Sequence, residues 1–138
     1  MEKRKIERVE EMPVFQACMA LALSIEKNSR AFAPDFKWLR SQMLRSSESV
    51  CANMTEGFYS QYSTEYLQAL YRCRREGQET MTHVRYAMAI RQMPDEKGLA
   101  LSEGYDSALK QLASLIASIE RKIRERGKAK AERPSDSS

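Results

Sequence analysis

Residues 41–57, which read SQMLRSSESVCANMTEG, decide the fold. They predict a helix with two stripes, because side chains three or four positions apart share one face of a helix. The apolar stripe has the spacing of a buried seam in a helical bundle and consists of Leu39, Met43, Val50 and Met54. The polar stripe beside it has two small hydroxyl side chains at its centre, ends in an amide and a carboxylate, and consists of Gln42, Ser46, Ser49, Asn53 and Glu56. Small side chains let another backbone come close, so the polar stripe predicts a second packed surface.

Glu56 stands where a helix disfavours a carboxylate. Gly57, directly after it, is the expected C-cap of the helix. A negative charge in the last turn faces the negative end of the helix dipole, at a cost of a few tenths to about 1 kcal/mol. We therefore expect a cationic or hydrogen-bonding partner for Glu56. Two interpretations stay open, since Asn53 and Glu56 either tie down the turn that follows or belong to an interface or binding site.

The segment before this helix predicts another one. Pro13 suits the first position of a helix, and Pro34 ends any continuation. Asp35 is then the expected cap of the second helix, which runs over residues 36–56. The buried positions of the first helix are expected to be Val14, Cys18, Leu21 and Ile25.

Two longer helices are predicted after a short aromatic turn. Ser63 is the expected N-cap of the third helix, which Pro94 closes, and Ser102 is the expected N-cap of the fourth. The third helix, at about 30 residues and ~1.5 Å each, would be the longest. Because every link is short, neighbouring helices must be antiparallel, and the expected fold class is all-α, an up-down-up-down antiparallel four-helix bundle. The buried positions are Tyr66, Leu70, Cys73, Gly77, Met81, Val84 and Met88, followed by Tyr105, Leu109, Leu112, Ile116, Ile119 and Ile123.

The composition is that of one globular domain. The 138 residues are 42% hydrophobic and 30% charged. No apolar run reaches the ~20 residues of a membrane span, and the N-terminus has no secretory signal, so we expect a cytoplasmic protein. We divide the chain into a charged lead-in (1–12), the four-helix bundle (13–126) and a disordered basic and polar tail (127–138).

The sequence offers little for catalysis. A di-metal site in a bundle needs several inward glutamates and two E-x-x-H motifs, whereas the only histidine, His83, follows Glu79 by four positions. Cys18, Cys51 and Cys73 lack the C-x-x-C spacing of a metal or redox site and are interpreted as small buried hydrophobes. We therefore expect a non-enzymatic protein with no catalytic residue, no metal and no cofactor.

Positive charge gathers near the end of the chain. The net charge is +4, and residues 120–138 hold seven basic and four acidic side chains. Such a segment can bind a polyanion when its cations lie on one face. The alternative is a tail that serves solubility alone.

Three arginines lie midway along the predicted third helix, close to the aromatic turn. Arginines near aromatic rings can hold phosphates while bases stack on the rings. The alternative is a pair of local ion pairs, Arg72 with Glu76 and Arg75 with Glu79. We predict nucleic-acid binding, with RNA favoured, by Arg72, Arg74, Arg75, Arg121, Lys122, Arg124, Arg126, Lys128 and Lys130.

Residues 39–57 also carry a resemblance to a known family. They are similar to the signature of the bacterial four-helix-bundle proteins encoded by intervening sequences in large-subunit rRNA genes, approximately L-x-S-Q-x-R-R-A-x-x-S-I-x-x-N-I-A-E-G. A weaker similarity extends over residues 6–123. The chain departs from the family at Arg75 and Glu76, where a Gly-Ser pair is usual, and near Gln61, where a basic residue is common. The matching positions are Leu39, Ser41, Gln42, Arg45, Ser49, Val50, Asn53, Met54, Thr55, Glu56 and Gly57.

The resemblance implies a ring-forming homo-oligomer, typically a homopentamer. It also implies a relation to the reverse transcriptase accessory proteins of diversity-generating retroelements, in which a basic barrel binds the enzyme and its template RNA. We predict a non-enzymatic, oligomeric RNA-binding protein, and the alternative is an assembly scaffold with no nucleic-acid role. The expected subunit-interface or motif residues are Gln42, Arg45, Ser49, Asn53, Glu56 and Gly57.

Overall fold

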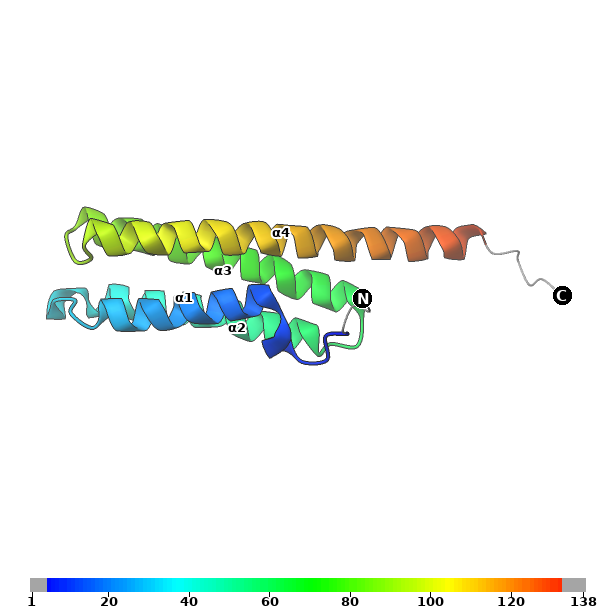
Figure 1. Cartoon of the computed structure of the whole chain (residues 1–138), viewed down its shortest axis with the longest axis horizontal. Coiled ribbons are helices and arrows are strands. Elements are labelled where there is room, and N and C mark those ends of the chain that lie inside the picture. The colour runs from blue at the N-terminus through cyan, green and yellow to red at the C-terminus, as the bar shows by residue number, and fades with distance from the viewer. Residues whose placement is uncertain (1–4, 133–138) are drawn as a thin grey trace.

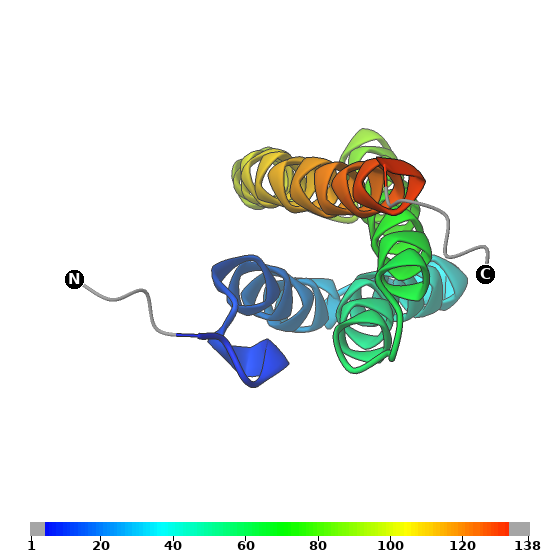
Figure 2. The same ribbon diagram turned by 90° about the vertical axis from the view of Figure 1, so that its right-hand side faces the viewer.

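The computed structural model of the protein describes residues 5–132, which fold into four α-helices with no strand among them. The helices are α1 (Pro13–Ser29), α2 (Lys37–Phe58), α3 (Ser63–Ala89) and α4 (Asp95–Glu132), and short 3₁₀ turns η1 (Val9–Glu11) and η2 (Pro34–Phe36) precede α1 and α2. They pack side by side as an antiparallel bundle (Figure 1). Seen along the bundle, α3 lies between α2 and α4 (Figure 2). The predicted all-α four-helix bundle is confirmed.

The core follows the predicted apolar positions. Leu70, Val84 and Leu112 are completely buried, and Tyr105 of α4 is buried together with its hydroxyl. Tyr66 and Met88, at the two ends of α3, are only partly covered. The buried side chains form two clusters, one around Leu70 and one around Val84 and Tyr105. Both stabilise the bundle because folding removes these side chains from water.

The three cysteines are buried and free, as their spacing indicated. Burial raises the pKa of Cys18 and Cys73 to about 12 and that of Cys51 to about 11. A thiol in such surroundings stays protonated and unreactive at neutral pH. These side chains pack as small hydrophobes.

Two predicted caps near α2 and α3 are wrong. The N-cap of α2 is Phe36, and Asp35 makes no capping bond because it lies inside the turn η2. The N-cap of α3 is Tyr62, so Ser63 is the first residue of the helix. The Ser63 hydroxyl instead accepts a hydrogen bond from Nη1 of Arg126 at 3.0 Å.

The start of α4 also differs from the prediction. The helix begins at Asp95, immediately after Pro94, and Ser102 is therefore an interior residue with a buried hydroxyl. Helix α3 ends earlier, at Ala89, and Arg91 turns the chain with a φ of 65°. The third helix is therefore ended by a sharp turn through Arg91, and not by Pro94 as the sequence predicted.

The longest helix is α4 with 38 residues, not α3 with 27. Its C-terminal end extends beyond the other three helices (Figure 1). The predicted disorder from Gly127 onward is wrong for residues 127–132, which are helical. Lysine, alanine and glutamate are strong helix formers, and one exposed glycine costs only about 1 kcal/mol. The rest of the predicted tail, residues 133–138, lies outside the described residues.

The charged lead-in contributes to the bundle. Val9 is buried, and its backbone N–H donates to the hydroxyl of Tyr59 at 3.2 Å. Met12 is also buried. Part of the lead-in therefore covers the end of the core near the α2–α3 turn.

Within residues 5–132, none of the helices combines the length and apolar character that a membrane span requires.

Candidate nucleic-acid interface

The polar stripe of α2 packs against α3 of the same chain. Ser46 is fully buried, and its hydroxyl accepts a hydrogen bond from Thr80 at 2.7 Å. Asn53 accepts one from Nε of Arg72 at 3.0 Å. The small residues therefore let α3 come close, while Gln42 and Glu56 at the two ends of the stripe stay exposed.

Gly57 is a contact residue and not a C-cap. Helix α2 continues to Phe58, and no glycine among residues 5–132 has a positive φ. A Cβ atom on Gly57 would lie 2.5 Å from Cβ of Ala69 and 3.0 Å from the ring of Tyr66. Position 57 thus requires glycine because α3 crosses so closely, and the predicted C-cap at Gly57 is wrong because the C-cap is Tyr59.

Arg45 of α2 forms ion pairs with Glu76 and Glu79, which the sequence predicted to pair with arginines of α3. Its Nη2 lies 2.8 Å from Oε1 of Glu79, and its Nη1 lies 3.5 Å from Oε2 of Glu76. The local pairs of these glutamates with Arg72 and Arg75 do not occur among the described residues. Burial raises the pKa of Glu76, whereas the contacts with Glu76 and then Arg45 lower the pKa of Glu79. The motif arginine therefore ties α2 to α3.

His83 stands at the edge of the same cluster. Its Nε2 lies 3.6 Å from Oε1 of Glu79, and 19% of its side chain is exposed. Across residues 5–132 there is no group of three or more His, Cys, Asp or Glu side chains that could hold a metal ion. The pair is at most half of a metal site.

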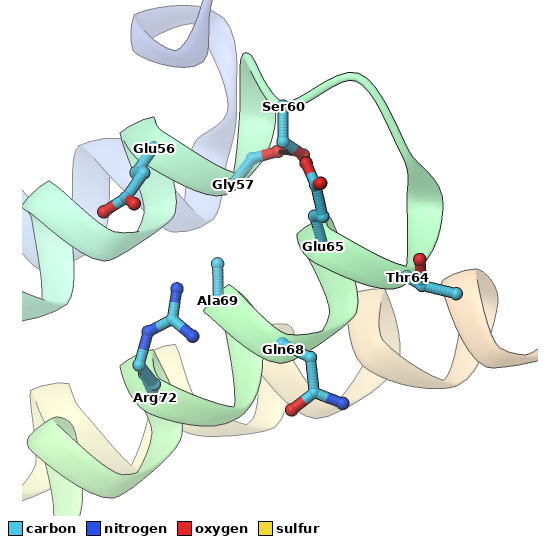
Figure 3. Close-up of a pocket in the computed structure, with 8 residues that line it drawn as sticks. All are labelled: Glu56, Gly57, Ser60, Thr64, Glu65, Gln68, Ala69 and Arg72. Atoms are coloured by element: carbon cyan, nitrogen blue, oxygen red, sulfur yellow. Dashed lines mark hydrogen bonds between the residues drawn. The ribbon is translucent and has the colours of Figure 1, made fainter.

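A pocket of about 500 Å³ lies where the last turn of α2 meets the first turns of α3. Figure 3 shows side chains from both helices around it. Gly57 and Ala69 lie at the point where the helices touch. The lining residues are Glu56, Gly57, Ser60, Thr64, Glu65, Gln68, Ala69 and Arg72.

Opposite charges line this pocket. The guanidinium of Arg72 is fixed through Nε by Asn53, and within residues 5–132 its terminal nitrogens make no ion pair or further hydrogen bond. Glu56 is exposed and likewise forms no ion pair in that range. The expected ion pair of Glu56 with a cation is thus not formed. Arg72 is the cation that lines the same pocket. Ser60, not Asn53 or Glu56, closes the turn by donating to the carbonyl of Gly57 at 2.6 Å.

The three arginines of α3 do not form one surface. Arg72 turns toward α2, whereas Arg74 lies over the ring of Tyr71, 5.2 Å from its centroid. The Tyr71 hydroxyl donates to Glu120 of α4 at 3.2 Å. Arg75 is exposed. The structure therefore places Arg74 beside the base of the overhanging part of α4.

The overhang, defined as residues 120–132 of α4, carries its cations on more than one face. Positions 121, 124 and 128 share one side of the helix, and positions 122, 126 and 130 share another. All six side chains are exposed, and they are Arg121, Lys122, Arg124, Arg126, Lys128 and Lys130. The contact of Arg126 with Ser63 holds the overhang beside the start of α3.

Aromatic side chains lie at the same end of the bundle. Tyr59 and Tyr62, in the turn between α2 and α3, are 56% and 58% exposed. That turn and the overhang lie at the same end of the bundle (Figure 1), and the pocket is lined by the first turns of α3 next to them. The pocket-lining residues Ser60, Thr64, Glu65 and Gln68 had no distinguishing pattern in the sequence. The sequence had singled out Glu56, Gly57 and Arg72, each for a separate reason, without bringing them together.

The fold and the motif define a class of protein. It is an antiparallel four-helix bundle in which the 41–57 motif, on α2, packs against α3. The chain belongs to the 23S rRNA-intervening sequence protein family, whose sequence profile matches residues 10–114. The overhang lies beyond that match.

Among solved structures, the chain is similar to a protein of unknown function from the S23 ribosomal protein family of Bacteroides thetaiotaomicron. The TM-score is 0.70 at 21% identity, over 75% of this chain and 95% of that chain. This similarity independently supports the bundle fold. No curated protein matches the chain.

Proposed function

We propose that this protein is a non-enzymatic, homo-oligomeric RNA-binding protein whose overhang is its main RNA contact. The observation that carries the proposal is the C-terminal end of α4, where the overhang holds six exposed basic side chains against three acidic ones. Phosphate contacts by lysine and arginine supply most of the sequence-independent affinity for nucleic acids. The exposed tyrosines at the same end add surfaces on which unpaired bases can stack.

RNA is favoured over DNA for two reasons. The family is named after intervening sequences of 23S rRNA. Exposed aromatic side chains beside a basic helix also suit unpaired bases, which are common in folded RNA and absent from duplex DNA.

A reverse transcriptase is the proposed protein partner. This rests on the resemblance to the accessory proteins of diversity-generating retroelements, which bind such an enzyme together with its template RNA. A neighbouring reverse-transcriptase gene with a repeated template would support this role.

Assembly is the second part of the proposal, with a homopentamer favoured by the resemblance. An uncovered apolar groove of about 470 Å³ runs between α1 and α2, and Met19, Leu23 and Leu44 line it. Its rim holds both signs of charge, from Glu48 and Arg45. A surface with apolar side chains and both charges suits contact with a copy of the same chain. A ring would also multiply the modest positive charge of one overhang.

The test is a fluorescence anisotropy titration of the full chain with a labelled structured RNA at low and near-physiological salt. We expect saturable binding that weakens with salt. Replacing Arg124, Lys128 and Lys130 together by glutamine should make the negative slope of log K against log salt shallower by about 2, because each single-strand phosphate contact contributes about −0.7.

The matched control removes the same charge elsewhere. Lys27, Lys37 and Arg85 are exposed side chains outside the overhang. Replacing them together by glutamine should leave the affinity and the salt slope nearly unchanged. Equal effects of the two triple variants would contradict the assignment of the overhang, and no binding at either salt would contradict the RNA role.

An assembly scaffold without a nucleic-acid role is the second candidate. The uncovered groove between α1 and α2 favours it, because assembly through this groove requires no cation of the overhang. It predicts the same native mass with and without RNA.

A further inference from the structure

We propose that the pocket between α2 and α3 binds a guanine base of single-stranded RNA, with Glu56 and Arg72 reading its edges. The proposal rests on the RNA-binding function above and deepens it by naming a base. The pocket volume of about 500 Å³ lies within the range of small-molecule sites, about 300–1,000 Å³. A single flipped-out base is a ligand of this kind.

The pocket's charge balance favours a base over a phosphate. Glu56 and Glu65 bring two carboxylates, and Arg72 brings one guanidinium. A phosphate would meet a net negative lining and would be repelled. A neutral base with both donors and acceptors meets partners of both kinds.

Guanine is the base whose edge matches these groups. It presents two adjacent donors, N1–H and N2–H₂, which one carboxylate can accept together, as Glu56 would. Next to them lie the acceptors O6 and N7, the atoms that arginine contacts most often in nucleic-acid recognition. Adenine, cytosine and uracil each lack the adjacent pair of donors, so the same carboxylate would make fewer hydrogen bonds with them.

Arg72 is positioned in advance for this contact. Its Nε is held by Asn53, and the Asn53 amide in turn donates to the carbonyl and hydroxyl oxygens of Ser49 at 2.9 and 3.0 Å. The terminal nitrogens of Arg72 are left for a ligand, on the opposite helix from Glu56 (Figure 3). A fixed guanidinium loses less freedom on binding than a mobile one.

Glu56 gains from such a ligand. It lies in the last turn of α2, where the helix dipole disfavours a carboxylate. Two N–H donors from a base would offset that cost. The neighbouring features fit a strand that continues past the pocket, since Tyr59 and Tyr62 can stack on adjacent bases and Arg126 lies beside Ser63 to meet a phosphate.

The experiment compares two labelled oligouridine strands that differ only at one central nucleotide, guanosine in one and adenosine in the other. Anisotropy titrations of the full chain should give a dissociation constant about tenfold lower for the guanosine strand. A third strand with inosine, which lacks the N2 amino group, should bind with intermediate affinity.

Glu56→Gln should abolish the guanosine preference, because glutamine presents a donor where the carboxylate presents only acceptors. Affinity for the adenosine strand should stay the same or rise slightly. Glu48→Gln is the matched control, since Glu48 is exposed on the same helix but lines the α1–α2 groove instead. Arg72→Lys keeps the charge and should also reduce the preference, because lysine cannot contact two acceptors in one plane.

Equal affinity of the native protein for the guanosine and adenosine strands would overturn the guanine assignment and leave the RNA-binding function standing. Equal loss of preference in Glu56→Gln and Glu48→Gln would overturn the role of the pocket. Failure of the native protein to bind these strands while it binds the structured RNA would overturn the guanine assignment alone, and failure with both would overturn the proposed function as well.

Discussion

Nε of Arg72 on α3 donates a hydrogen bond of 3.0 Å to Oδ1 of Asn53 on α2. This bond connects the arginine cluster of α3 with the polar stripe of α2, two features that were predicted separately from the sequence. Because Asn53 is held in turn by Ser49, the guanidinium is fixed at the border of the pocket. The same contact thus serves both the packing of the two helices and the orientation of a charged group.

Asn53→Ala should lower the free energy of unfolding by about 1–2 kcal/mol, since a hydrogen bond to a charged, half-buried group is lost. Asn28→Ala is the control, because Asn28 bonds only Ser24 on its own helix and should cost about 0.5 kcal/mol. Urea unfolding followed by circular dichroism measures both. A cost at position 53 no greater than at position 28 would show that the cross-helix bond adds nothing.

Gly57→Ala should destabilise the protein by about 1–3 kcal/mol, although alanine is the better helix former. The added Cβ would lie 2.5 Å from Cβ of Ala69, so α2 and α3 would have to separate. Gly127→Ala is the control, because no atom outside its own stretch of helix lies within 4 Å of that Cβ, and it should raise stability by up to about 1 kcal/mol. Thermal unfolding of the two variants should therefore shift in opposite directions, and an increase at both positions would contradict the close contact.

The apolar pattern predicted the bundle well, because apolar residues at helical spacing form the face of the helix that is buried. Leu70, Val84 and Leu112 repeat at the spacing of a helix face, and all three are buried. The caps were predicted less well. Ser63 and Ser102 are good cap residues by type, but Arg126 takes the first hydroxyl, and the second lies inside a helix that begins a full turn or more earlier.

The candidate site could not be predicted from the spacing of residues within one helix, because its contacts cross between two helices. Arg45, Glu76 and Glu79 are ordinary surface residues in sequence, and the pairs expected within α3 are replaced by a contact with α2. Helix crossing decides which partner a long charged side chain reaches, and that crossing depends on the small residues Ser46 and Gly57. The polar stripe therefore predicted a packed surface but not which helix would cover it.

The buried thiols predict a loss of stability at alkaline pH. In the folded protein the pKa of Cys18 and Cys73 is raised to about 12 and that of Cys51 to about 11, from an ordinary value of 9.0. The folded state therefore keeps protons that the unfolded chain loses. Stability is complete below pH 9.0 and falls as pH rises toward these raised values, by up to about 1.4 kcal/mol per thiol per pH unit.

Urea midpoints at about pH 8 and about pH 10 measure this effect. Cys73→Ala should be less stable at the lower pH, because a cavity is left in the core, yet lose less on going to the higher pH. An unchanged pH dependence in this variant would show that the thiol of Cys73 does not contribute.

Leu23→Lys should reduce the native mass of the protein if α1 and α2 form the contact between copies. Leu23 is 63% exposed and lines the apolar groove, and a lysine there would have to bury a charge on assembly. Leu99→Lys is the matched control, because Leu99 is 56% exposed on α4, outside the groove. Native mass spectrometry and light scattering should show an oligomer for the native chain and for Leu99→Lys, and smaller species for Leu23→Lys. A monomeric native chain would contradict assembly altogether. An intact oligomer in Leu23→Lys would place the subunit contact on another face, and Gln42 and Glu56 are the exposed residues of the polar stripe that such a contact could use.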